Sequence, residues 1–183
     1  MTKITLCFSV FTAILLAAGS ASAQWAAPSA SVIPEARGYV AIPNVALVPD
    51  KKRTYRAVYE STRAAQEPSQ LLPAVNMTGL ALNAFAASGV PLRNAKFVIV
   101  FRGPAMAGIL NDASYRAKFG VANPNLKVLS GLKKAGVELF VCGQSLIVEN
   151  IDPKTLSPDV RIASAAQIVL MAYQHDGYAV LSY

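Results

Sequence analysis

An uninterrupted apolar run at residues 97–101 (FVIVF) is the feature that most limits how this chain can fold. A strand that is apolar at every position is typically buried on both of its faces, as in the interior of a parallel sheet. Four further segments, at residues 54–60, 137–142, 160–163 and 178–181, also predict strands. Helix-forming segments separate these runs, and such strand–helix alternation predicts an α/β fold with a parallel sheet covered on both sides.

The segments between the runs predict helices at residues 70–87, 104–118, 124–135, 145–149 and 165–175. Pro73 falls near the first turn of the first of these helices, where proline is least harmful. Gly89, Gly136 and Gly177 follow the ends of three of them, which is where glycine commonly stops a helix. We therefore expect one α/β domain over residues 51–183, a length typical of a single domain.

Residues 1–23 have the three-part pattern of a secretory signal. Lys3 precedes an apolar run at residues 4–18, and the small residues Ala21 and Ala23 then stand where a signal peptidase reads the chain. The run is about 15 residues long, which is short for a membrane span of about 20. We expect cleavage after Ala23 and a periplasmic or secreted protein with no membrane segment. An uncleaved anchor and a buried helix are the alternatives.

Residues 24–50 are rich in proline and contain Pro28, Pro34, Pro43 and Pro49. Proline prevents a helix here and disfavours a central strand. We expect an extended arm whose later part lies along the domain or along a neighbouring subunit.

The composition excludes several classes of protein. With 54% hydrophobic and 15% charged residues, the chain is too apolar to be disordered. Its net charge of +7 is not gathered into a basic tail, and we expect no nucleic-acid partner. The dinucleotide-binding, P-loop, nucleophile-elbow and Cys-x-x-Cys motifs are all missing. Two Cys and one His are too few for a structural zinc site, so we expect neither metal nor cofactor.

Cys142 is the leading candidate for a functional residue. Ligands and reactive groups gather beyond the carboxyl ends of the strands in a parallel sheet, and Cys142 ends one of the expected strands. Removal of residues 1–23 would also remove Cys7, which leaves Cys142 without a partner for an internal disulfide. A helix N-terminus lowers a cysteine pKa, and a helix is expected shortly after this residue. The alternative is a buried structural cysteine, because free Cys is among the most buried residue types.

The neighbours of Cys142 suggest supporting roles. Gly143 allows a sharp turn and leaves room for a partner to approach. Arg102 ends the neighbouring strand and could supply positive charge, while Gln144 or Ser145 could hydrogen-bond the sulfur. Whether these residues make the protein an enzyme is left open by the sequence.

Two other polar features have simpler interpretations. His175 is the only histidine and ends the last expected helix, where a cation suits the helix dipole; a catalytic base is the alternative. A cluster of basic residues indicates a solvent-exposed start of a strand or, as the alternative, a surface for an acidic partner. It consists of Lys51, Lys52, Arg53 and Arg56.

Five segments in a fixed order carry a resemblance to a known family. They are FVIVFRGPA at 97–105, SYRAKFGVANPNL at 114–126, LKKAGVELFVCGQSL at 132–146, NIDPKTLSPDVRIA at 150–163 and QHDGYAVL at 174–181. Together they resemble the DsrE/DsrF-like family, which has the YchN-like fold, over residues 54–183. The resemblance implies an α/β three-layer sandwich with a five-stranded, mostly parallel sheet. It also implies homo-oligomers, often trimers or hexamers.

The same resemblance implies a role in sulfur relay. In such proteins a cysteine beyond the third strand carries a persulfide sulfur between donor and acceptor proteins, and Cys142 matches its position. Two features depart from the pattern: cytosolic relay proteins have no secretion signal, and their turn after the cysteine is richer in alanine than Cys-Gly-Gln-Ser.

Three hypotheses follow. The first is an exported sulfur carrier or sulfurtransferase-like protein that holds a persulfide on Cys142. The second is a non-catalytic periplasmic oligomeric binding or scaffold protein in which Cys142 is structural. The third is a redox-sensing thiol that forms an intersubunit disulfide.

Overall fold

The computed structural model describes residues 25–183, so the signal segment expected at 1–23 lies outside the described residues. Within these residues, helices separate five successive strands, and two of the five α-helices lie between β2 and β3. The strands are β1 (Tyr55–Ser61), β2 (Ala95–Phe101), β3 (Glu138–Cys142), β4 (Arg161–Ala163) and β5 (Ala179–Ser182). The helices are α1 (Pro73–Ala87), α2 (Asp112–Phe119), α3 (Asn125–Lys134), α4 (Gly143–Val148) and α5 (Ala166–His175).

The five strands form one sheet in the order β4-β3-β2-β1-β5, and every neighbouring pair is parallel. The expected α/β fold with a five-stranded sheet is therefore confirmed, and the sheet is parallel throughout. β2 lies at its centre, and the run at 97–101 is buried at every position. All the strands end at the same edge, so the residues that follow β1, β2, β3 and β4 lie close together.

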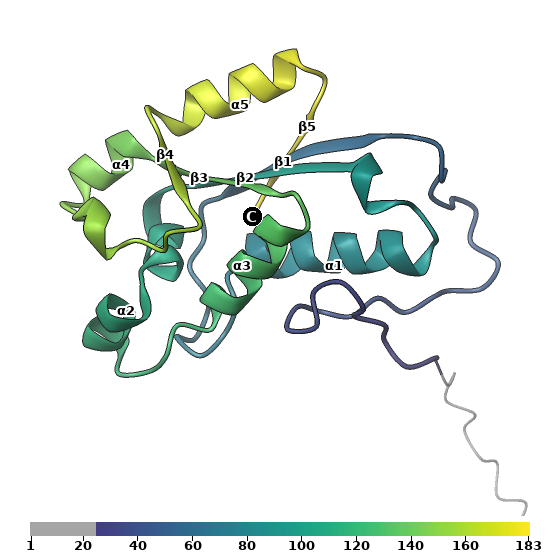
Figure 1. Ribbon diagram of the computed structural model, residues 1–183, viewed down its shortest axis with the longest axis horizontal. Coiled ribbons are helices and arrows are strands. Elements are labelled where there is room, and N and C mark those ends of the chain that lie inside the picture. The colour runs from purple at the N-terminus through teal and green to yellow at the C-terminus, as the bar shows by residue number, and fades with distance from the viewer. Residues whose placement is uncertain (1–24) are drawn as a thin grey trace, which may run out of the picture.

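Helices cover both faces of the sheet in three layers (Figure 1). α1 and α3 lie on one face, over the larger apolar core, and α5 lies on the other face, over a smaller one. The strand alternation divides the residues between them: Phe97, Ile99 and Phe101 enter the larger core, while Val98 and Val100 enter the smaller. Cys142 belongs to the smaller core, on the α5 face.

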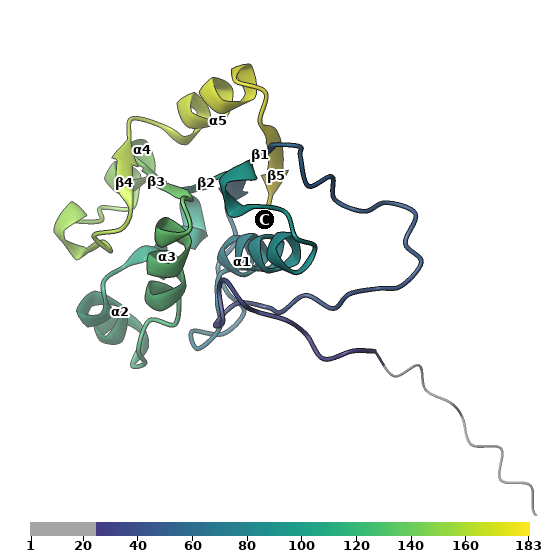
Figure 2. The same cartoon turned by 45° about the vertical axis from the view of Figure 1, so that its right-hand side comes forward.

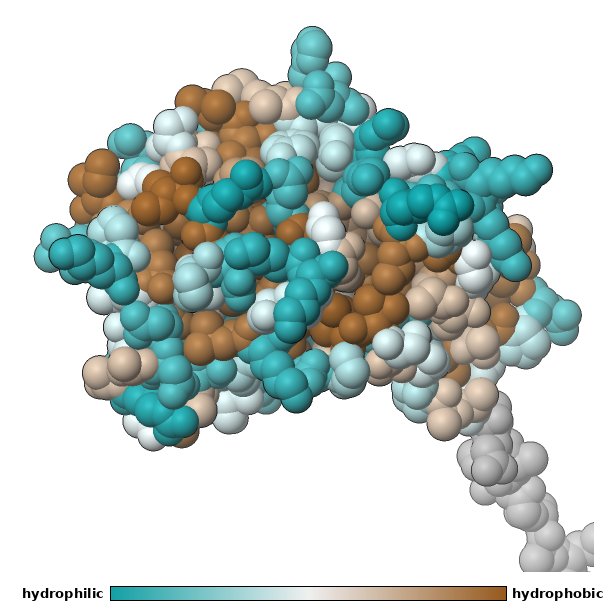
Figure 3. Space-filling view, viewed as in Figure 1, coloured by the Kyte–Doolittle hydropathy of each residue, from teal (hydrophilic) through white to brown (hydrophobic). Residues whose placement is uncertain are grey.

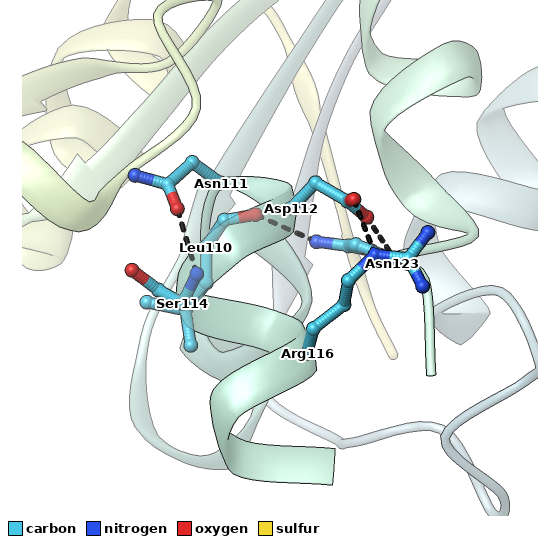
Figure 4. Close-up of polar contacts among 6 residues, drawn as sticks. All are labelled: Leu110, Asn111, Asp112, Ser114, Arg116 and Asn123. Carbon is cyan, nitrogen blue, oxygen red and sulfur yellow. Dashed lines mark hydrogen bonds and ion pairs between the residues drawn. The ribbon is translucent and has the colours of Figure 1, made fainter. Parts of the chain in front are cut away.

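The expected helix at 104–118 is wrong as a single element. The chain forms a 3₁₀ helix (Gly103–Ile109), passes through two extended residues, Leu110 and Asn111, and then begins α2. Asn111 sets this start, because its Oδ1 accepts a 2.9 Å hydrogen bond from the Ser114 N–H (Figure 4). Asp112 then accepts bonds from the Arg116 Nε and from the Asn123 N–H, and the second bond ties the first residue of α2 to the loop that follows the helix (Figure 4).

The boundaries of two other helices also differ from the sequence prediction. α1 begins at Pro73 rather than at 70, because Leu72 precedes a proline and takes an extended conformation. α4 begins at Gly143 rather than at 145, so it follows Cys142 directly.

The proline-rich arm packs through its earlier part, whereas the later part was the one expected to lie along the domain. Ile33 is only 1% exposed and joins the larger core. The buried Asn83 amide of α1 holds this part of the arm: Oδ1 accepts from the Val32 and Ile33 N–H groups, and Nδ2 donates to the Ile33 carbonyl. Residues 41–48 are exposed and swing away from the body (Figure 2). Among residues 25–183, no helix is both long enough and apolar enough to cross a membrane.

Candidate functional site

Cys142 lies where β3 passes into α4, at the edge of the sheet that the sequence indicated. Its backbone pairs with Ala163 of β4. The next residue must be small, since a Cβ added to Gly143 would lie 2.8 Å from the Ala163 carbonyl oxygen. Gly143 therefore allows α4 to begin against the β4–α5 turn, which sets the direction of the backbone N–H groups beside the thiol.

The Cys142 residue is buried, with 3% of its surface exposed. Burial raises the pKa of its thiol, but hydrogen bonding lowers that pKa by more. The hydroxyl and the backbone N–H of Ser145 interact with the sulfur, as do the backbone N–H groups of Ala166 and Gln144. The net result is a thiol pKa below its ordinary value, because these donors favour the charged thiolate.

A small cavity of about 180 Å³ gives access to this thiol. Cys142 lines it together with Arg102 from the end of β2, Gln144, Ser145 and Val148 from α4, Glu149 directly after α4, and Gln167 from α5. The structure thus brings four of the five predicted residues around one cavity. The fifth, Gly143, lines the neighbouring groove described below.

The sequence suggested that Arg102 supplies positive charge to the thiol, but its guanidinium is paired with a carboxylate. Its Nε donates a 2.7 Å hydrogen bond to Glu60 Oε1, and the Ser182 hydroxyl donates to Glu60 Oε2 at 2.9 Å. Arg102 is also not among the groups that lower the thiol pKa. Its charge is therefore largely balanced by Glu60, while its two terminal amino groups lie outside this ion pair.

Glu60 and Gln167 were missed by the sequence analysis. Glu60 stands near the end of β1, on the same face of the sheet as Val58 and hence the α5 face, and a charged residue at that register was the available signal. Gln167 lies three residues after Ser164, in the first turn of α5. Its proximity to Cys142 depends on the way α5 crosses the sheet, which no local pattern encodes.

A larger hollow lies beside the thiol cavity, between α4 and β4. This α4–β4 groove has a volume of about 830 Å³ and shares Gln144 with the thiol cavity. Its lining is mainly apolar and includes Leu146, Ile147, Ile151 and Ile162, with Asp152 at the rim.

His175 ends α5, whereas Gln167, which borders the thiol cavity, is near its start. The imidazole is exposed, and Nδ1 lies 3.7 Å from Asp176. The structure therefore does not bring His175 to Cys142. Within residues 25–183, no three or more His, Cys, Asp or Glu side chains gather where they could hold a metal ion.

Fold and site together define a parallel α/β protein with a buried thiol at the end of the third strand. The model of the DsrE/DsrF-like family matches residues 56–183, and the chain belongs to this family. Two solved structures share the fold. One is a protein of unknown function, MTH1491, from Methanobacterium thermoautotrophicum, at 19% identity; the other is the YchN protein from E. coli, at 16%. Each aligns with a TM-score of 0.52 and covers 70% of this chain and 99% of its own. No protein among the curated ones matches the chain.

Proposed function

We propose that this protein is an exported sulfur carrier, or sulfurtransferase-like protein, that holds a persulfide on Cys142. The observation that carries the proposal is the environment of the sulfur: a thiol with a lowered pKa, surrounded by hydrogen-bond donors, at the wall of a cavity. The DsrE/DsrF-like family is associated with sulfur relay, and this gives the proposal its reaction class.

The proposed chemistry needs no cofactor. The Cys142 thiolate attacks the outer sulfur of a persulfide donor, R–S–SH. A new bond forms from Sγ to that sulfur, the donor S–S bond breaks, and the donor leaves as the thiolate R–S⁻ with the electron pair of the broken bond. The product is Cys142–S–SH, and an acceptor thiolate removes its outer sulfur by the same step. The partners are therefore a persulfide donor and a thiol acceptor.

The residues around the cavity would act on charge and position. The Ser145 hydroxyl and the N–H groups of Ser145 and Gln144 stabilise the thiolate before attack. Arg102 and Glu60 together fix a polar wall at the end of β2. The side chain of Gln167 closes the cavity from the α5 side.

The test is the mass of the intact protein after exposure to glutathione persulfide. We expect a gain of one sulfur atom in the wild-type protein and none in Cys142→Ser. The matched control is Ser130→Ala on α3, which lies on the opposite face of the sheet and should load like the wild type.

A structural cysteine is the second candidate function, and one observation favours it. Only 3% of Cys142 is exposed, and it packs with Val100 and Ala166 in the smaller core. In that case the protein would be a binding or scaffold protein, and the thiol would react with iodoacetamide only after unfolding. Rapid native alkylation favours the carrier instead. The same burial disfavours a disulfide between subunits, because two sulfur atoms must come into contact to form one.

Export is proposed from the pattern at residues 1–23 alone. N-terminal sequencing of the protein recovered from the host tests it. We expect the mature chain to begin at Gln24, and a chain that still begins at Met1 would contradict export by cleavage.

A further inference from the structure

Among the exposed apolar surfaces of residues 25–183, which also include Ile168 and Met171 on α5, two lie at opposite edges of the sheet. The first is the arm segment 42–48, in which Ile42, Val45, Leu47 and Val48 all lie open to solvent, with Leu47 88% exposed. The second is the α4–β4 groove, where Ile147 is 73% exposed. The space-filling view shows apolar surface gathered over α4 and β4, at its left (Figure 3). Exposed apolar patches of this kind mark interaction sites.

The arm of one molecule cannot fill its own groove. It is held on one side by the bridge between Ser29 and Tyr39, and on the other by the Tyr55 hydroxyl, which accepts from the Asp50 N–H at 2.7 Å. Tyr55 opens β1, which pairs with the edge strand β5, whereas the groove lies against β4 at the opposite edge. Figures 1 and 2 show the arm and α4 at opposite sides of the molecule.

Charge complements the apolar match. The exposed cations Lys51, Lys52 and Arg53 follow the arm segment directly. On the other surface, the exposed carboxylate Asp152 lines the groove, and the exposed Glu149 lines the thiol cavity beside it. With Asp50 counted, residues 50–53 carry a net charge of +2, and Glu149, Asp152 and Lys154 together carry −1. The arm is therefore apolar with a basic end, and the groove is apolar with a net negative charge at the side where it adjoins the thiol cavity.

We propose that the arm segment 42–48 of one copy of this chain binds in the α4–β4 groove of a second copy. Such a contact joins two different surfaces, so it is head-to-tail and produces a ring when the rotation between copies closes. The groove is lined by Gly143 and Gln144, the two residues that follow Cys142. The arm of a neighbour therefore lies against the turn that bears the thiol. The arm precedes the part of the chain that matches the family, residues 56–183.

The test uses one charged substitution on each surface and measures the mass of the purified protein in solution by sedimentation velocity. Leu47→Asp places a charge on the arm and leaves the groove intact. Ile147→Asp places a charge in the groove and leaves the arm intact. Both side chains are exposed, so both variants should fold like the wild type. Val121→Asp, at an exposed apolar residue away from both surfaces, is the matched control.

We expect each variant alone to form a smaller particle than the wild type, and the control to match the wild type. Mixing the two variants should restore association, because the intact arm of Ile147→Asp still fits the intact groove of Leu47→Asp. A wild-type protein that is monomeric would overturn the proposal, as would a Leu47→Asp variant of unchanged mass. Variants that both dissociate but fail to associate when mixed would show that like surfaces meet, which also overturns it.

Discussion

The Arg102 side chain donates from Nε to Glu60 Oε1 across 2.7 Å, and the two residues meet at the edge of the sheet that also carries Cys142. Arg102 and Cys142 line the same cavity. The positive charge beside the thiol is thus balanced by a carboxylate from the next strand. The balance of the Arg102 charge against Glu60, and against Glu149 in the cavity lining, should set how strongly the cavity attracts an anion.

Neutralising one member of this pair should shift the thiol pKa in a known direction. Glu60→Gln leaves the Arg102 charge unbalanced and should lower the Cys142 pKa further, because a nearby cation favours the thiolate. Arg102→Gln leaves the carboxylate and should raise it. A pH titration of the thiolate ultraviolet absorbance measures both. Glu67→Gln, on an exposed loop, is the control, and shifts of the same sign in the first two variants would refute the account.

Loss of the Ser145 hydroxyl should slow the reactions of the thiol. The hydroxyl is one of the groups that lower the Cys142 pKa, so Ser145→Ala should leave a smaller fraction of thiolate. A hydrogen bond to a charged group contributes about 1.5–3 kcal/mol, which corresponds to a roughly 10- to 150-fold smaller thiolate fraction. A thiolate of higher pKa is also more nucleophilic and recovers about half of this loss on a logarithmic scale, so we expect native alkylation by iodoacetamide to slow by about three- to tenfold. Ser130→Ala should react at the wild-type rate. An unchanged rate in Ser145→Ala would show that the hydroxyl does not act on the sulfur.

Gly143 should tolerate no side chain. A Cβ there would approach the Ala163 carbonyl to 2.8 Å, so Gly143→Ala must displace α4 or the β4–α5 turn. We expect a loss of about 1–3 kcal/mol in the free energy of unfolding, measured in urea, together with a raised Cys142 pKa. Gly131→Ala is the control, since its added Cβ would meet only the flexible end of Ile33 at 3.3 Å. Equal stability of the two variants would contradict the steric argument.

The stability of the protein should depend on pH through Cys142. The pKa of Cys142 in the folded protein lies below the ordinary value of 9.0. At a pH between these two pKa values, the unfolded chain therefore binds more protons than the folded one. The free energy of unfolding should therefore rise with pH across this window, relative to Cys142→Ser. The contribution is fully present above 9.0 and is lost as the pH falls through the folded pKa. Parallel pH profiles for the two proteins would contradict the lowered pKa.

The arm should detach when the Asn83 amide is removed. Asn83→Leu leaves the N–H groups of Val32 and Ile33 without their acceptor in a buried site, which should cost about 2–4 kcal/mol. Limited proteolysis should then cut residues 25–50 faster than in the wild type. Asn76→Ala removes only one exposed bond, to the Arg37 N–H, and should change stability by about 1 kcal/mol or less. An arm that stays protected in Asn83→Leu would mean that Ile33 alone anchors it.

The sequence contained enough to predict the sheet and the position of the thiol. The apolar run at 97–101 defines a doubly buried strand, and Cys142 follows from the end of the next strand along the chain. These predictions succeeded because each depends on residues that are neighbours in the chain. The division of the segment 104–118 was missed, since the Asn111 cap interrupts a segment whose composition is otherwise helical.

The partners around the thiol could not be predicted in the same way. Glu60 reaches Arg102 only because β1 and β2 are adjacent and in register, and Gln167 reaches the cavity only through the path of α5. The Asn83 side chain likewise binds backbone about 50 residues away along the chain. Such contacts depend on strand order and helix placement, which periodicity and composition do not specify.

The most direct test of the central claim is a load-and-release measurement on Cys142. The protein is exposed to glutathione persulfide, freed of donor, weighed intact, then mixed with a small acceptor thiol and weighed again. The account predicts a gain of one sulfur atom at Cys142 that the acceptor then removes, with neither change in Cys142→Ser. A wild-type thiol that gains no sulfur while folded, yet gains it once unfolded, would contradict the account and leave Cys142 as a packing residue.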